Sequence, residues 1–307
     1  MYLITGGAGF IGSDIAKKLV GKGEKVRVLD NLSTGRRSNL EGYFGDLDFV
    51  RADINAPEIR KHFEDVKIVF HQAALSSVVR SMEAPEETEY NNVIGTINVL
   101  NCALEAGVEK VIMASSASVY GDAGDGPLSE ALPAQPLSPY AFSKHACEYY
   151  CKYFSDVRGL ETVILRYFNV FGPNQDPDSE YSGVITIFLQ RMKAGLRPVV
   201  YGDGEQTRDF VYVEDVARAN LLAASSGVGG GEKINIAGGR SVSLLELVEK
   251  MNVALGTELE PIFEDSREGD IRHSRADIKR ARELIDYHPV VDFAEGLEKM
   301  VEATDRS

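Results

Sequence analysis

Residues 2–12 read YLITGGAGFIG, and this stretch decides the fold of the first half of the chain. The apolar run YLIT is followed by Gly6, Gly9 and Gly12, and residues 11–22 form an amphipathic segment. A β-branched run that ends in glycines and opens a helix predicts a strand–turn–helix unit. Glycines at this spacing let a backbone approach a pyrophosphate, and a helix N-terminus attracts its negative charge. We therefore expect a dinucleotide to bind here.

The next apolar run, KVRVLD, ends in Asp30, 18 residues after Gly12. A carboxylate at this position accepts hydrogen bonds from the adenosine ribose and disfavours the additional phosphate of NADP. NAD is therefore the expected cofactor. Arg36 and Arg37 leave NADP open as the less favoured alternative, because guanidinium groups bind phosphate well.

Short apolar runs and amphipathic segments alternate from Tyr2 to Val170. Runs that are apolar throughout and separated by helices predict an α/β fold with a doubly wound parallel Rossmann sheet. The expected strands cover residues 2–5, 25–30, 48–53, 67–74, 110–116 and 161–172, and the main helices 11–22, 89–106 and 141–157.

After Gly172 the alternation of apolar runs and amphipathic segments gives way to a polar loop and shorter elements, which predicts a second domain. We expect residues 1–170, with 209–238 returning to them, to form the NAD-binding domain. Residues 171–307 would form a smaller α/β domain that binds the substrate. The run SSGVGGG, residues 225–231, has the composition of a flexible linker.

Charge and composition exclude several classes of partner. The chain of 307 residues has 47 acidic and 33 basic residues, and its net charge of −14 repels nucleic acid and anionic membranes. No apolar run approaches the length of a membrane span, and no secretory signal opens the chain. Cys102, Cys147 and Cys151 have no spacing typical of a metal site. We expect reduced, mostly buried thiols in a cytoplasmic protein that binds no metal.

Three residues have the chemistry of alcohol oxidation. Tyr140 and Lys144 share a helix face at i and i+4, and a neighbouring cation draws the pKa of a phenol toward neutrality. Ser116, in the run SSASVYGD, would hydrogen-bond the same substrate oxygen. We expect these residues to remove a hydroxyl proton while hydride leaves the same carbon.

Motifs over almost the full length resemble one known family: TGGAGFIGS, LDNLSTG, ADI, HQAAL, NNVIGT, SSASVYG, SPYAFSK, RYFNVFGP, GDGEQTRDFVYVEDVA and REGDIRHSRADI. The chain resembles the extended short-chain dehydrogenase/reductases and, within them, the nucleotide-sugar 4-epimerases. The resemblance implies a UDP-sugar 4-epimerase that inverts C4 reversibly through a 4-keto intermediate, with tightly bound NAD.

The resemblance also assigns roles to residues. Ser116, Tyr140 and Lys144 would be catalytic. NAD would contact these three residues and Gly6, Gly9, Phe10, Ile11, Gly12, Asp30, Asn31, Ser33, Thr34, Gly35, Asp53, Ile54, Gln72, Ala73, Ala74, Asn92 and Phe168. The UDP-sugar would contact Ser116, Tyr140, Asn169, Val184, Val199, Tyr201, Arg208, Arg267, Asp270 and Ser274.

Two positions separate the epimerases from their relatives. Enzymes of this kind that dehydrate sugars use acids at the positions of Ala117 and Ser118, and neither alanine nor serine carries those protons. A 4,6-dehydratase or another NAD-dependent enzyme acting on sugar nucleotides remains the enzymatic alternative, and an NAD-sensing binding module the non-enzymatic one.

Ser274 bears on the choice of sugar. The family has a bulky Tyr here when glucose and galactose are the only substrates, so the small side chain favours UDP-GlcNAc and UDP-GalNAc, with UDP-Glc and UDP-Gal also accepted. His71 and His145 are expected to be packed rather than catalytic. The aromatic cluster Tyr149, Tyr150, Tyr153 and Phe154 fits either a core or a dimer face, and the family resemblance favours a homodimer.

Overall fold

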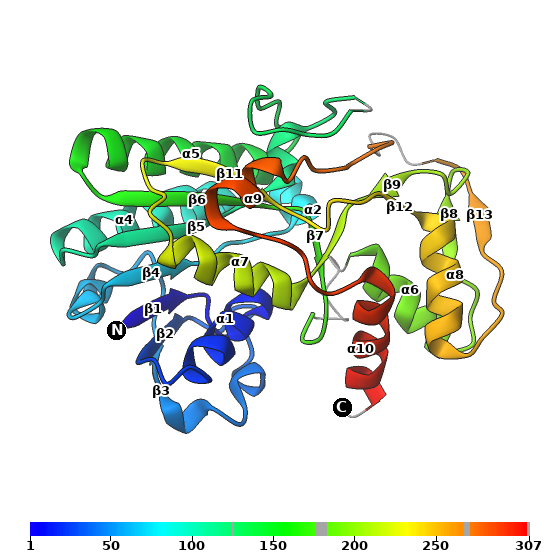
Figure 1. Ribbon diagram of the computed structural model, residues 1–307, viewed down its shortest axis with the longest axis horizontal. Helices are drawn as coiled ribbons and strands as arrows, with labels where there is room; N and C mark the ends of the chain where they lie inside the picture. The colour runs from blue at the N-terminus through cyan, green and yellow to red at the C-terminus, as the bar shows by residue number, and fades with distance from the viewer. Residues whose placement is uncertain (125, 176–182, 267–270, 306–307) are drawn as a thin grey trace.

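Seven short strands form one parallel sheet, shown on the left of Figure 1. The computed structural model describes residues 1–124, 126–175, 183–266 and 271–305. The strand order is β11-β6-β5-β4-β1-β2-β3, and every neighbouring pair is parallel. The bounds are β1 (Tyr2–Thr5), β2 (Val26–Asp30), β3 (Leu47–Arg51), β4 (Ile68–His71), β5 (Lys110–Ser116), β6 (Glu161–Tyr167) and β11 (Glu232–Ile236).

Helices cover both faces of this sheet, which explains why the central strands are largely apolar. One hydrophobic cluster joins the sheet to α1 and α7, and a second joins it to α4 and α5. The sequence prediction of a doubly wound parallel α/β fold is confirmed. The helices are α1 (Phe10–Val20), α2 (Val78–Glu83), α3 (Pro85–Glu89), α4 (Gly95–Glu105), α5 (Pro139–Arg158), α7 (Val213–Ser225) and α9 (Lys279–Ile285).

Short helical turns connect these elements. The predicted helix 89–106 begins with a π-helical turn, η4, and α4 follows it directly. The turns are η1 (Arg37–Leu40), η2 (Phe44–Asp46), η3 (Pro57–Phe63), η4 (Tyr90–Ile94) and η5 (Ala117–Tyr120).

Local signals set the ends of α5, the longest of these helices. The Ser138 hydroxyl accepts a hydrogen bond from the backbone N–H of Ala141 at 3.2 Å, and Pro139 occupies the first turn. The helix ends at Gly159, whose φ of 76° is readily adopted only by glycine. These signals extend the predicted helix 141–157 by a few residues.

A smaller region packs around its own core, on the right of Figure 1. Three strand pairs belong to it or border it, two parallel (β7–β10, β8–β13) and one antiparallel (β9–β12). Its elements are β7 (Asn169–Phe171), α6 (Val184–Lys193), β8 (Val199–Tyr201), β9 (Thr207–Arg208), β10 (Phe210–Tyr212), β12 (Val242–Ser243), α8 (Leu244–Leu255), β13 (Ile262–Glu264) and α10 (Phe293–Asp305).

Two sequence predictions need correction here. The predicted strand 161–172 is divided into β6 and β7, because the backbone N–H of Phe168 bonds the Ile236 oxygen and the chain then pairs with β10. The glycine-rich run 225–231 is a hydrogen-bonded turn between α7 and β11. The N–H of Gly231 donates to the Thr162 oxygen at 2.9 Å, which ties this turn to β6.

Two further observations concern the chain as a whole. Cys102, Cys147 and Cys151 are buried free thiols, as the sequence predicts. Within the described ranges, no helix is both long and apolar enough to cross a membrane.

Candidate active site

The predicted cofactor residues follow the carboxyl ends of the parallel strands. Gly6 follows β1, Asp30 ends β2, Gln72 follows β4 and Ser116 ends β5. Parallel strands end at one edge of a sheet, and the strand order reverses between β1 and β4. Open α/β sheets bind ligands at such a reversal, so the topology brings these residues to a binding edge.

The glycine loop is built by close backbone contacts. Gly6 has a φ of 67°, and a Cβ added to it would lie 2.7 Å from the nitrogen of Ala73. A Cβ on Gly12 would collide with the Gly6 carbonyl oxygen. Gly9 is the N-cap of α1 and offers no side chain to satisfy the first N–H groups of the helix. This cradle fits the pyrophosphate of a dinucleotide.

Asp30 fixes the loop that follows β2. Its buried carboxylate accepts the backbone N–H of Ala8 at 2.9 Å and that of Leu32 at 2.8 Å. Gly35 passes so close that an added Cβ would lie 2.9 Å from both carboxylate oxygens. Ser33 and Thr34 complete this loop, which wraps around the carboxylate.

Asn31 and Asp53 pair beside the same edge. The Asn31 amide donates to the Asp53 carboxylate at 2.8 Å. Burial opposes ionisation of Asp53, but hydrogen bonds from the Asn55 backbone and the Asn31 amide hold its pKa below the ordinary value. Arg37, offered above as a phosphate ligand, places its guanidinium carbon 4.5 Å from the centre of the Phe44 ring.

The other predicted cofactor residues are held by their neighbours. The Asn92 amide donates to the Leu75 oxygen at 3.0 Å and to the Ser143 hydroxyl at 2.9 Å. Gln72 hydrogen-bonds Tyr167 and Asn220. The remaining residues of this group lie near the ends of strands or at the start of α1: Phe10, Ile11, Ile54, Ala73, Ala74 and Phe168.

Ser116, Tyr140 and Lys144 come together where β5 meets α5. The Tyr140 phenol lies close enough to the Ser116 hydroxyl for that hydroxyl to lower its pKa, and the same hydroxyl accepts the backbone N–H of Ser118 at 3.1 Å. Lys144 is buried one helical turn later, and its Nζ donates to the Ala114 oxygen at 2.8 Å. The predicted catalytic residues are therefore neighbours.

The expected pKa of the phenol needs correction. Burial raises the pKa of Tyr140 above its ordinary value, and the hydrogen bond to Ser116 offsets this only in part. Burial also lowers the pKa of Lys144, whose ammonium bonds a backbone oxygen. The i, i+4 spacing shows that the two residues share a helix face, but it gives no measure of their burial.

Neither of the two histidines near the site is arranged as a general base. His71 is buried, bonds the hydroxyls of Thr5 (2.7 Å) and Thr96 (2.9 Å), and burial lowers its pKa to about 3. It stays neutral at physiological pH, which confirms the packed role. The His145 ring lies edge-on to the Tyr149 ring, with centroids 4.9 Å apart.

Several of the predicted substrate residues lie on or beside the short strands. Nη1 of Arg208 donates to the backbone oxygens of Thr207 (2.9 Å) and Ile271 (2.7 Å). The N–H of Ser274 also donates to the Thr207 oxygen, at 3.2 Å, so Arg208 and the segment around Ser274 are neighbours. The Asn169 amide donates to the Asp209 oxygen at 3.1 Å.

The other substrate positions are less closely connected. Val184 begins α6, and Val199 and Tyr201 lie on β8. The Tyr201 oxygen accepts from the Gln206 amide at 2.6 Å, which links β8 to the segment that carries Arg208. Arg267 and Asp270 lie outside the described residues.

Buried charges that the sequence reasoning missed support both parts of the site. Asp209 has no exposed surface, and its carboxylate accepts N–H groups from Gly239 (3.1 Å) and Ala276 (3.0 Å). Glu148 and Arg166 form a buried ion pair behind Tyr140. The available signal was a charge inside an apolar run, as in VILRYF for Arg166.

With this geometry in place, comparison with known proteins gives the family. The family model described as the NAD dependent epimerase/dehydratase family matches residues 2–237. The chain belongs to this family. Its cofactor is NAD, which agrees with the glycine cradle and with Asp30.

Members of this family with solved structures are similar over nearly the whole chain. One is a UDP-N-acetylglucosamine 4-epimerase from Methanobrevibacter ruminantium in complex with UDP-N-acetylmuramic acid (39% identity, TM-score 0.95, 99% of this chain and 98% of that one). Another is a UDP-glucose 4-epimerase from Thermotoga maritima with UDP-glucose (38%, TM-score 0.94, 99% and 98%). The UDP-glucose 4-epimerase of Mycolicibacterium smegmatis is 40% identical over 305 residues, which cover 98% of this chain and 97% of that protein.

Proposed function

We propose that this family member is a UDP-sugar 4-epimerase that inverts C4 reversibly through a 4-keto intermediate. The observation that carries the proposal is the group formed by Ser116, Tyr140 and Lys144. The two residues after Ser116 are Ala117 and Ser118, neither of which is an acid. A hydroxyl, a phenol and an ammonium move a hydroxyl proton, whereas eliminating water also needs an acid that the next two positions do not supply. The similar solved epimerases support the same reaction.

Each residue then has one task. Tyr140, as phenolate, takes the proton of the C4 hydroxyl and later returns it, and Ser116 holds the same oxygen. The Lys144 ammonium supports the phenolate against the burial that opposes its ionisation. NAD, when bound, supplies reversible hydride exchange, and the glycine loop with Asp30 would hold it.

The proposed sugars are UDP-GlcNAc and UDP-GalNAc together with UDP-Glc and UDP-Gal. Ser274 leaves room for an acetamido group, and its segment lies beside Arg208, the proposed ligand of the diphosphate. Arg272, two residues before Ser274, makes a bidentate pair with Asp203 at 2.7 and 2.9 Å, which disfavours its binding the carboxylate of a uronic acid.

One incubation tests the reaction. Purified enzyme is mixed with UDP-GlcNAc or UDP-glucose without added cofactor, and the products are identified by NMR. We expect the C4 epimer without accumulation of NADH. A 4-keto product would indicate the dehydratase instead, and bound NAD without any product would indicate the binding module.

A homodimer is part of the proposal. The helices α2, η4 and α5 pack against one another, and apolar side chains project from them into solvent. Monomers seldom expose so many apolar side chains together. Size measurement over a dilution series should show a dimer at assay concentrations, and a monomer throughout would contradict it. The exposed residues are Val78, Val79, Met82, Tyr90, Ile94, Phe142, Tyr149, Tyr150, Tyr153 and Val157.

The same proposal assigns NAD and the sugar nucleotide to different parts of the chain. Residues 1–170 and 209–238 would hold NAD, supported by β11 pairing with β6 in the large sheet. Residues 171–307 would hold the sugar nucleotide, supported by the separate core around α6 and α8. The buried free thiols support a cytoplasmic location.

A further inference from the structure

The helix that carries Tyr140 and Lys144 has a third buried polar residue on the same face. Glu148 follows Lys144 by four residues, so the three side chains occupy successive turns of α5. Glu148 is only 3% exposed, and carboxylates are seldom buried this deeply unless they are paired. The reaction described above does not use it.

Glu148 joins three elements through its two oxygens. Nε of Arg166 donates to Oε1 at 2.8 Å and Nη2 donates to Oε2 at 2.6 Å, which makes a bidentate pair between α5 and β6. The Ser115 hydroxyl on β5 donates to Oε1 at 2.6 Å. Nδ1 of His145 lies 3.6 Å from Oε2. One carboxylate therefore sets the position of α5 against two strands.

Arg166 is itself held in place. Its guanidinium carbon lies 4.7 Å from the centre of the Tyr120 ring, and the Tyr120 hydroxyl donates to Asn235 at 2.7 Å. Arg166 also pairs in register with Ser115 across β6 and β5. The carboxylate of Glu148 thus meets partners that the sheet has already fixed.

Helix α5 makes three contacts with consecutive residues of β5. Lys144 bonds the Ala114 oxygen, Glu148 accepts from the Ser115 hydroxyl, and Tyr140 lies close enough to Ser116 for that hydroxyl to lower its pKa. The first two contacts fix the rotation of α5 about its axis and its position along β5, and the third is the catalytic contact. A buried ion pair contributes little more stability than apolar side chains of equal volume, but its bonds are directional.

We propose that Glu148 is a positioning residue, which acts through Ser115 and Arg166 to hold Tyr140 against Ser116. The inference rests on the proposed role of Tyr140. The titratable groups that act on Tyr140 or Lys144 are Cys147, Cys151 and Glu148 on α5 and His71 on β4, and Ser115→Ala alters none of them.

The test removes the hydrogen bond between Ser115 and Glu148 and leaves the ion pair of Glu148 with Arg166 intact, so that the protein folds. We expect Ser115→Ala to lower kcat about tenfold, the size of one lost hydrogen bond, with KM for the UDP-sugar within about twofold. The acid limb of the kcat profile should move to higher pH, because a phenol that loses its bond to Ser116 ionises less readily.

Ser155→Ala is the matched control. The Ser155 hydroxyl also joins α5 to the sheet region, donating to the Leu160 oxygen at 2.8 Å and accepting the Thr162 N–H at 3.0 Å, but about four turns beyond Tyr140. It should lower the melting temperature about as much as Ser115→Ala and leave kcat and its pH profile unchanged. Equal kcat values for the two variants would overturn the proposal.

A double-mutant cycle connects Ser115 to Glu148. Glu148→Asp keeps the charge opposite Arg166 but withdraws the carboxylate by one methylene, so its loss of kcat should not add to that of Ser115→Ala. Additive losses would show that the two residues act separately. A titration of the Tyr140 phenol, taken as the absorbance difference from Tyr140→Phe, needs no turnover. It separates failure of this inference from failure of the epimerase assignment.

Discussion

The two parts of the candidate site are held in place differently. At the edge of the large sheet, buried side chains support one another, as in the contacts of Glu148 with Arg166 and of Asn92 with Ser143. Around the short strands, Arg208 and Ser274 depend on backbone oxygens of neighbouring loops. In the proposed reaction, the first arrangement would fix the reacting atoms within narrow limits, whereas the second would hold the nucleotide while the sugar rotates. Substitutions should therefore affect turnover in the first part and affinity or selectivity in the second.

The largest expected effect is that of Tyr140→Phe in the sheet part. Losing the proton carrier should lower kcat about a thousandfold, while NAD stays bound because the glycine loop is untouched. Epimer formation by NMR and nucleotide released on denaturation measure the two quantities. Tyr287→Phe, which removes the buried hydroxyl that donates to the Ala237 oxygen at 3.0 Å, is the control and should retain kcat. Near-normal epimerisation by Tyr140→Phe would refute its role.

Arg208→Gln should show the opposite pattern in the substrate part. A charge-assisted hydrogen bond contributes about 2 kcal/mol, so KM for the UDP-sugar should rise about thirtyfold while kcat changes only a few-fold. Arg272→Gln is the control, because Arg272 is exposed and paired with Asp203. Steady-state kinetics distinguish the outcomes. A fall in kcat without a change in KM would remove the contrast between the two parts.

Sequence patterns predict the sheet part better than the substrate part, for a physical reason. Apolar runs and glycines are local signals, so the strands, the cofactor edge and the meeting of Ser116 with Tyr140 follow from them. The pair of Glu148 with Arg166 depends on how α5 packs across β5 and β6, which no local pattern encodes. Burial also reverses the expected pKa of Tyr140, because desolvation depends on the whole fold.

The break between β6 and β7 shows the same limit. The run 161–172 is largely apolar, and its pattern alone gives no sign that the pairing with β11 ends at Phe168, whose N–H bonds the Ile236 oxygen, and that Asn169 joins β10. The partner strands decide where the break falls, and they lie far away in sequence.

Ser274→Tyr tests selectivity within the substrate part. A bulky ring beside the sugar should exclude an acetamido group more than a hydroxyl, so turnover of UDP-GlcNAc should fall about tenfold more than that of UDP-glucose. Relative kcat/KM values on the four UDP-sugars measure this difference. Ser274→Ala should leave the ratio unchanged. Equal losses on both classes of sugar would show that this position does not select between them.

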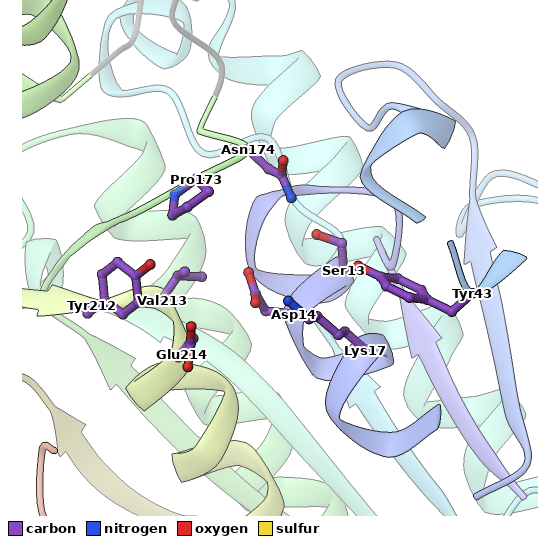
Figure 2. Close-up of a pocket in the computed structure, with 9 residues that line it drawn as sticks. All are labelled: Ser13, Asp14, Lys17, Tyr43, Pro173, Asn174, Tyr212, Val213 and Glu214. Carbon is purple, nitrogen blue, oxygen red and sulfur yellow. The ribbon is translucent and has the colours of Figure 1, made fainter. Parts of the chain in front are cut away.

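The smallest expected effect is on the free energy of unfolding, and it lies at the boundary where α1 packs against α7. A cavity of about 70 Å³ lies here. Figure 2 shows residues that line it, among them Asp14 and Lys17 of α1, Tyr212 of β10 and Glu214 of α7. Burial raises the pKa of Asp14 to about 6, with Lys17 opposing the shift and Glu214 adding to it. This boundary therefore favours a neutral carboxyl.

The sign of the pH dependence follows from this raised pKa. Between the unfolded value near 4 and the folded value of about 6, the folded protein binds more protons, so the stability contributed by Asp14 is complete at pH 4 and is lost as pH rises through 6. Asp14→Asn should add about 1 kcal/mol to the free energy of unfolding at pH 8, since solvent screens part of the effect, and should change little at pH 4. Urea unfolding at both pH values measures this, with Asp46→Asn as an exposed control. An equal gain at both pH values would mean that ionisation of Asp14 does not weaken the boundary.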